Sequence, residues 1–384
     1  MLRKFLDEKP LYYETIDYTR MPRVYENIKQ HFNNPKIIHL IGTNGKGTTG
    51  RFLASALHSL GSSVGHYSSP HILKFNERIW LNGEDICDEQ LDSAHAELLN
   101  ILTKEEADSL SYFEYTTLLG MWIYQDLDYV VLEAGLGGEH DATAVFPKEL
   151  TLVTPIDIDH QAFLGNTVKE IAKTKLNAVQ KVAILANQPH YEVYEVAQNI
   201  SDEKDLKFKP VDELIGSTDR EKIESISKKL SLAPYLTENL KLAISALKHL
   251  KLEYSVENFM NSRLFGRVSH ISENIIVDVG HNTLAASSIL NTLRGEKYIL
   301  VYNSYKDKNY LEILSILKPI ISHIEIIQIN DERAEKQEVL QKTIQDLDIV
   351  YKLFHKIDKS RKYLVFGSFS VVESFLKSID GDFE

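Results

Sequence analysis

The fold of the N-terminal half is decided by Gly42-Thr43-Asn44-Gly45-Lys46-Gly47-Thr48. This stretch lies between an apolar run, Lys36–Ile41, which predicts a strand, and Thr48–Leu60, which predicts a helix. Glycines let the backbone turn its N–H groups toward phosphate oxygens, Lys46 adds a positive charge, and the Thr48 hydroxyl can reach a magnesium ion. The stretch therefore predicts a phosphate-binding loop, although an extra glycine separates the lysine from the threonine. The alternative is a glycine-rich turn without a ligand.

Strand and helix patterns alternate on both sides of a polar stretch, 202–229, which is expected to hold an irregular edge element. Such alternation is typical of parallel sheets flanked by helices. We expect two α/β domains: residues 1–264 form a parallel-sheet mononucleotide-binding domain, and residues 265–384 form a smaller Rossmann-like domain. Further expected strands are Ser63–Tyr67, Tyr129–Ala134, Thr151–Thr154, Val182–Leu185, Asn274–Asp278, Tyr298–Tyr302, His323–Ile329, Asp348–Tyr351 and Tyr363–Phe366. Further expected helices are Thr116–Gln125, Val168–Lys175, Leu236–Leu250 and Thr283–Leu293.

Composition excludes several classes of protein. The chain of 384 residues has a formal net charge of −12, which disfavours non-specific binding of nucleic acid. The sequence contains neither a run of 18 apolar residues nor the apolar core of a signal peptide, so we expect a cytoplasmic protein. A single cysteine, Cys87, rules out a disulfide within the chain. A monomer is the expected state.

Four ordered motifs resemble the dihydrofolate synthase/folylpolyglutamate synthase family of the Mur ligase superfamily. The first is the phosphate-binding loop. The others are a serine-proline-histidine segment with an asparagine-glutamate-arginine continuation, a Leu-Glu-Ala-Gly signature followed by Asp-Ala-Thr, and a C-terminal Asp-Val-Gly-His-Asn. They occupy His66–Ile79, Val131–Thr143 and Asp278–Asn282. Members of this family use ATP to join L-glutamate to dihydropteroate, to reduced folates, or to both, and the resemblance implies an acyl-phosphate intermediate.

The resemblance also implies which residues bind ATP. Thr43, Asn44, Gly45, Lys46, Gly47 and Thr48 would hold the triphosphate. Arg267 would contact the phosphates, Asp278 the ribose, and His281 would lie near the nucleotide. Asn239 would contact adenine, unless it is only the N-cap of the helix that follows it. ATP is therefore expected to lie between the two domains.

Two magnesium ions are implied. Thr48 would bind one, and Ser69, Glu133 and His160 the other, although a histidine is an unusual magnesium ligand. Lys175 corresponds to a lysine that is carbamylated in the family, and the alternative is an unmodified lysine on a helix surface. Lys46, His160 and Lys175 are thus the residues expected to take part in catalysis.

The acceptor site implied by the resemblance is less distinctive. Its residues would be Asp17, Tyr18, Tyr112, Phe113, Glu114, Asp141 and Ala142. Phe113 could pack on a pterin ring and Glu114 could bond its nitrogens, and the alternative for Phe113 is ordinary core packing. Retention of all three segments favours dihydrofolate synthesis, with polyglutamylation beside it.

The chain departs from the family pattern at several positions. Glu139 stands where the family has arginine, Ala144 where it has asparagine, and Thr174 and Asn177 flank Lys175 in place of glutamate and glycine. Asn309 replaces an aspartate in the C-terminal domain. None of these changes removes an expected phosphate or metal ligand.

Three other functions stay open on the sequence. The chain could be a folylpolyglutamate synthase without dihydrofolate synthase activity. A cell-wall Mur ligase would need an additional N-terminal domain, and only 35 residues precede the first expected strand. A non-catalytic nucleotide-binding module would not need Ser69, Glu133, His160 and Lys175 together.

Overall fold

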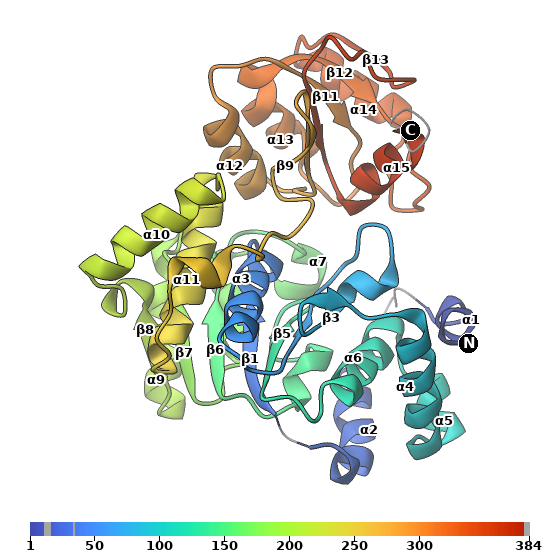
Figure 1. The fold of residues 1–384 in the computed structure, drawn as a ribbon. Helices are drawn as coiled ribbons and strands as arrows, with labels where there is room; N and C mark the ends of the chain where they lie inside the picture. Colours follow the sequence, from blue (N-terminus) through green and yellow to red (C-terminus); the bar gives the residue numbers. More distant parts are fainter. Residues whose placement is uncertain (11–16, 34, 380–384) are drawn as a thin grey trace. The chain divides into compact units, whose positions relative to one another are not determined.

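A computed structural model describes residues 1–10, 17–33 and 35–379. Contacts divide the chain into two compact units (Figure 1). Unit 1 consists of Met1–Leu232 and Leu236–Arg263, and unit 2 consists of Ala233–Tyr235 and Leu264–Glu384. Residues Ala233–Tyr235, which the predicted boundary placed in the N-terminal domain, therefore pack with unit 2.

The sheet of unit 1 has eight strands among the described residues, in the order β4-β3-β2-β5-β1-β6-β7-β8. The strands are β1 (Lys36–Ile41), β2 (Val64–Tyr67), β3 (Ile79–Leu81), β4 (Glu84–Asp85), β5 (Tyr129–Glu133), β6 (Leu150–Val153), β7 (Val182–Leu185) and β8 (Lys207–Pro210). All neighbours from β2 to β8 run parallel, as the sequence predicted. The antiparallel strands β3 and β4 at one edge were not predicted.

Helices cover both faces of this sheet. They are α1 (Leu2–Asp7), α2 (Arg20–Ile28), α3 (Lys46–Ser59), α4 (Asp88–Ile101), α5 (Lys104–Ser109), α6 (Tyr112–Ile123), α7 (Gln161–Leu164), α8 (Val168–Leu176), α9 (Tyr191–Lys204), α10 (Ser217–Lys229) and α11 (Pro234–His249). A strand points successive side chains to opposite faces. Thus Ile38 and Leu40 of β1 pack with α3, α10 and α11, whereas Ile37 packs with α2, α4 and α6. The loops at the carboxyl ends of the strands are left to form a site.

Unit 2 has a six-stranded sheet among the described residues, in the order β13-β12-β11-β14-β10-β9. Its strands are β9 (Ser269–Ser272), β10 (Ile275–Asp278), β11 (Tyr298–Tyr302), β12 (Ile321–Ile326), β13 (Tyr351–Leu353) and β14 (Tyr363–Phe366). Its helices are α12 (Thr283–Leu293), α13 (Tyr310–Leu317), α14 (Gln337–Asp346) and α15 (Phe369–Ile379). Only β9 runs antiparallel to its neighbour. The observed class is α/β with two mostly parallel sheets.

Several expected elements differ from the structure. The polar stretch 202–229 holds the edge strand β8 and a regular helix, α10, whose buried Ile223 and Ile226 are hidden among charged residues in the sequence. Strand β13 covers Tyr351–Leu353 rather than Asp348–Tyr351. Helix α11 starts at Pro234, so Asn239 lies inside the helix and the N-cap reading of this residue was wrong. No helix in the described ranges is both long and apolar enough to cross a membrane.

The core of unit 1 can be tested at Leu152, which is fully buried in β6. The substitution Leu152→Ala is expected to lower the free energy of unfolding by about 2–5 kcal/mol, because it removes buried methyl groups and leaves a cavity. Both tryptophans, Trp80 and Trp122, lie in unit 1, so tryptophan fluorescence during urea unfolding reports on this unit. The control Leu99→Ala, on the exposed side of α4, should change stability by less than about 0.5 kcal/mol. Equal losses in the two variants would contradict the assignment of the core.

Candidate functional site

The loop between β1 and α3 is fastened to the segment that follows β6. The N–H of Thr43 donates to the Pro155 carbonyl at 2.9 Å, and the Thr43 hydroxyl exchanges 3.0 Å hydrogen bonds with the backbone of Asp157. Gly42 has a φ of +138°, and a Cβ there would lie 2.0 Å from the Thr154 hydroxyl. Glycine is therefore required at this position. The loop is held in the open shape that a phosphate-binding loop needs.

Lys46, the first residue of α3, lies at the carboxyl ends of β1 and β5. Its Nζ donates to the Gly42 carbonyl at 3.2 Å and lies 3.9 Å from Oε1 of Glu133, the last residue of β5. The Glu133 Oε2 accepts from the backbone N–H of Ser69 at 3.3 Å. The register of the sheet explains why Glu133 lies close to Lys46, because Leu40 and Glu133 are paired across β1 and β5. Three expected site residues, Lys46, Ser69 and Glu133, are thus brought together.

Lys175 reaches the same loop from α8. Its side chain is buried and its Nζ donates to the Gly42 carbonyl at 2.9 Å. Burial, together with the positive charge of Lys46, lowers the Lys175 pKa to about 7. Asp159 and Asp141 oppose that shift. A considerable fraction of the amine is therefore neutral near pH 7. Because the side chain is buried, the surface position given by the alternative was wrong, whereas modification of Lys175 stays a prediction.

The Thr48 hydroxyl fits a metal ligand. Thr48 is buried in the first turn of α3, and its Oγ1 has no hydrogen-bond partner in the described part of the protein. A buried hydroxyl without a partner is costly, and a bound cation would satisfy it. Among the described residues, no three His, Cys, Asp or Glu side chains gather into a metal-binding group. Such a group is not required by magnesium, which keeps several waters and takes phosphate oxygens as ligands.

His160 has a left-handed backbone, with a φ of +51°, at the N-terminus of α7. Its N–H donates to Oδ1 of Asp159 at 2.9 Å, and its Nε2 lies 3.8 Å from Oδ2 of the same carboxylate. A positive φ is uncommon for a residue other than glycine. The conformation marks a constrained turn beside the carboxylate that influences Lys175.

The expected nucleoside contacts lie in both units. In unit 1, Asn239 is buried in α11, its Nδ2 has no partner among the described residues, and a Cβ on Gly45 would lie 2.5 Å from its Oδ1. In unit 2, Asp278 is the last residue of β10, and its carboxylate is buried. Burial raises the Asp278 pKa above its ordinary value, and the charge of Arg267 offsets part of that rise. His281 Nδ1 lies 3.2 Å from the Val279 carbonyl. Each unit therefore holds part of the set that the sequence assigned to ATP.

A hollow of about 650 Å³ lies beside the turn η3 (Ala142–Val145). Tyr18 and Asp141 both line it, and the Tyr18 ring lies 4.6 Å from the His140 ring. Asp141 is buried: its Oδ2 accepts from the Leu136 N–H at 2.9 Å and its Oδ1 accepts from the N–H and hydroxyl of Thr143. Two residues assigned to the acceptor therefore share one cavity. Ala142 is buried in the same turn, and Asp17 is exposed, with its Oδ1 accepting from the N–H and hydroxyl of Thr19, the residue before α2.

The segment from Tyr112 to Glu114 does not line this hollow. Tyr112 lies under the guanidinium of Arg78, 5.3 Å from its ring centre. Phe113 packs against Gly135, where a Cβ would come within 2.5 Å of the phenyl ring. Glu114 forms a buried ion pair with Arg20, with Oε2 accepting from Nη2 at 2.7 Å. Phe113 therefore contacts the Leu-Glu-Ala-Gly signature, whereas the Glu114 carboxylate is engaged by a residue that the sequence reading missed.

Two departures from the family pattern are partners in the structure. The Asn177 side chain donates to Oε2 of Glu139 at 2.8 Å, and the Glu139 N–H donates to the Thr174 carbonyl at 3.0 Å. Another departure, Ala144, accepts at its carbonyl from the buried Nζ of Lys148 at 2.5 Å. Glu139 and Ala144 line the hollow, whereas Thr174 directly precedes Lys175 in α8.

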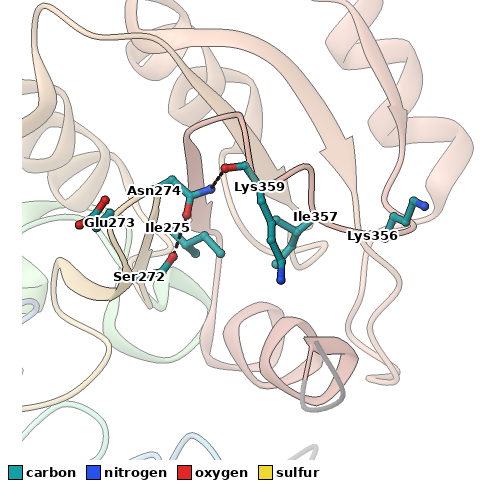
Figure 2. A pocket seen from close by; sticks show the side chains of 7 residues that line it. All are labelled: Ser272, Glu273, Asn274, Ile275, Lys356, Ile357 and Lys359. Carbon is teal, nitrogen blue, oxygen red and sulfur yellow. Dashed lines mark hydrogen bonds between the residues drawn. The ribbon is translucent and has the colours of Figure 1, made fainter. Parts of the chain in front are cut away.

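A smaller hollow of about 340 Å³ lies on unit 2 (Figure 2). The β9–β10 turn and the chain before β14 form it, with Ser272, Asn274 and Lys359 joined by hydrogen bonds. The sequence assigned no function to these residues. The Ser272 hydroxyl donates to the Asn274 side chain, which itself donates to the carbonyls of Lys359 and Arg361.

Comparisons with known proteins place the chain among ligases. No family model matches it. A Haemophilus influenzae protein named dihydrofolate synthase/folylpolyglutamate synthase is 31% identical over 93% of the chain and 92% of that protein. A protein of the same name from Escherichia coli is 31% identical over 75% of the chain and 71% of that protein.

Solved structures agree. The crystal structure of Helicobacter pylori folylpolyglutamate synthetase is 37% identical and superimposes with a TM-score of 0.80 over 98% of the chain and 97% of that protein. Escherichia coli FolC in complex with DHPP and ADP is 25% identical, with a TM-score of 0.82 over 99% of the chain and 97% of that protein.

The buried pair of Arg20 and Glu114 gives a test of this part of the site. Glu114→Gln removes the carboxylate that pairs with the buried Arg20 guanidinium, so the free energy of unfolding should fall by about 3 kcal/mol, measured by urea unfolding with tryptophan fluorescence. The control is Glu106→Gln, because Glu106 caps α5 as Glu114 caps α6 but has no buried arginine partner. Unchanged stability of the Glu114 variant would show that the carboxylate is not needed for the fold.

Proposed function

The chain belongs to the dihydrofolate synthase/folylpolyglutamate synthase family, and we propose that it joins L-glutamate to dihydropteroate and to reduced folates through an acyl phosphate. It is an ATP-dependent acid–amino-acid ligase. The observation that carries the proposal is the gathering of Lys46, Glu133, the Ser69 backbone and Lys175 around one phosphate loop.

The reaction has two steps. An oxygen of the acceptor carboxylate attacks the γ-phosphorus of ATP, the bond to ADP breaks, and an acyl phosphate forms. The amine of glutamate then attacks the acyl carbon, phosphate leaves with the acceptor's oxygen, and the amine loses a proton. Repulsion between the carboxylate and the phosphates is the main obstacle to the first step, and cations reduce it.

The residues of the chain provide those cations at one place. The Lys46 side chain lies at the loop, and hydrogen bonds from Lys46 and Lys175 to the Gly42 carbonyl fix the backbone there. Thr48 and Glu133 supply oxygen donors that suit magnesium, which when bound would neutralise phosphate charge. A Yersinia pestis protein of the same fold, 23% identical, was solved with AMPPNP and Mn ion. We assign Thr48, Ser69, Glu133 and His160 to the metal ions.

Nucleoside and acceptor contacts complete the proposal. Asn239, Arg267, Asp278 and His281 are assigned to the nucleotide. We assign the hollow lined by Tyr18 and Asp141 to part of the acceptor, because it combines an aromatic ring with a buried carboxylate whose pKa burial raises. Phe113 would meet the acceptor beside Gly135. The Escherichia coli protein was solved with DHPP, which makes a pterin acceptor the expected one.

Release of phosphate by the purified protein tests the function. With ATP, magnesium and L-glutamate, release is expected both with dihydropteroate and with a reduced monoglutamyl folate. Release with only one acceptor would restrict the enzyme to one of its two activities. Folded protein that binds ATP but releases no phosphate with either acceptor would overturn the proposal in favour of a binding module.

Lys175 is further proposed to be carbamylated. Its neutral amine adds CO2 by forming a nitrogen–carbon bond and losing a proton, which replaces a cation beside Lys46 by an anion. Because the lowered pKa is about 7, the neutral amine fraction grows as pH rises from 6 to 8, and carbamylation should grow with it.

The expected result is a protein carbamate signal in 13C NMR with labelled bicarbonate at pH 8, which weakens as the pH is lowered. Lys175→Met should abolish the signal and lower kcat by about 100-fold or more, because the buried site loses its charge. Lys173→Met alters an exposed residue of the same helix and should leave both unchanged. A carbamate signal that persists in the Lys175 variant would refute the assignment.

A further inference from the structure

Asp278 of unit 2 is surrounded by donors. Its Oδ1 accepts from the Gly280 N–H at 2.8 Å, and its Oδ2 accepts from the Val268 N–H at 3.0 Å and from the Tyr235 hydroxyl at 2.9 Å. A carboxylate has about four acceptor positions, so three are filled and one, on Oδ1, is left for a further donor. The tyrosine provides the only side-chain hydrogen bond to Asp278 that the described structure shows.

Backbone strain accompanies this arrangement. Val268 has a φ of +45°, which is rare for a β-branched residue, and this conformation directs its N–H to Asp278. The Ser269 hydroxyl accepts from the N–H groups of Gly266 and Arg267, which keeps the loop wound beside the carboxylate. The loop therefore stabilises one orientation of the Asp278 side chain.

Tyr235 reaches Asp278 from the first turn of α11. The segment Ala233–Tyr235 packs with unit 2, whereas the helix continues into unit 1 from Leu236. One helical turn beyond Tyr235, at the spacing of four residues that shares a helix face, Asn239 packs on Gly45 of the phosphate loop.

We propose that Tyr235 is a positioning residue for the nucleotide: its hydroxyl holds the Asp278 carboxylate in the orientation in which Oδ1 accepts from a ribose hydroxyl. The inference rests on the nucleotide role proposed for Asp278. Without the Tyr235 hydroxyl, the Asp278 side chain is free to rotate out of this orientation. The Asp278 pKa also rises, because the hydrogen bond from Tyr235 lowers it. Arg267 and Tyr235 are the charged and titratable side chains that face Asp278, and the other donors are backbone N–H groups.

The test is the dissociation constant of ADP, measured by calorimetry on the full chain, which requires no turnover and so stands apart from the proposed ligase reaction. Tyr235→Phe should raise this constant about fivefold at pH 7.5, which matches the typical net contribution of one hydrogen bond. The weakening of ADP binding at acid pH should begin at higher pH in the variant, because the Asp278 pKa rises. In an Asp278→Asn background, Tyr235→Phe should change the constant less than twofold.

The chain offers a matched control in unit 1, where the Tyr254 hydroxyl donates to the buried Asp219 at 2.7 Å. Tyr254→Phe removes the same kind of bond away from the site and should leave ADP binding unchanged. Unchanged ADP binding in Tyr235→Phe, or the same fold-loss with and without Asp278, would overturn the proposal. Absence of dihydropteroate-dependent phosphate release in the wild type would instead count against the proposed reaction alone.

Discussion

The Gly42 carbonyl is the point on which the site of unit 1 depends. Two lysines from different helices donate to it, Lys46 at 3.2 Å and Lys175 at 2.9 Å, and burial makes two neighbouring ammonium groups costly. Glu133, 3.9 Å from Lys46, offsets part of the positive charge. The negative charge of a triphosphate would offset the charge of these lysines, so the loop suits an anion. Burial first, and then the charge of Lys46, lowers the Lys175 pKa at this point.

Much of the fold of unit 1 could be predicted from the sequence because the patterns that indicate it lie within short stretches of the chain. The apolar run of β1, the glycines of the loop and the start of α3 are contiguous, and the alternation of strands and helices fixes a parallel sheet. Glu133 could be placed at a strand end for the same reason. The β3–β4 edge and helix α10 were missed because a two-residue strand and a charged helix leave weak patterns.

Long-range pairs could not be predicted. Nothing near Glu114 in the sequence announces Arg20, which lies 94 positions away, and nothing near Gly42 announces Thr154. The partnership of Glu139 with Asn177 shows the same limit, because each residue looked like an isolated departure until the structure joined them. Tyr235 could have been predicted to share a helix face with Asn239, because it lies four residues before it. The predicted helix began at Leu236, however, and therefore left Tyr235 out.

ATP bound at this loop is proposed to give its γ-phosphoryl group to the carboxylate of the acceptor. The most direct measurement uses dihydropteroate labelled with 18O in its carboxylate, turned over with ATP, magnesium and L-glutamate, followed by mass analysis of the released phosphate. Each released phosphate should carry one labelled oxygen, because the carboxylate oxygen that attacks the γ-phosphorus leaves with it. Unlabelled phosphate, formed while dihydrofolate accumulates, would contradict the acyl-phosphate route.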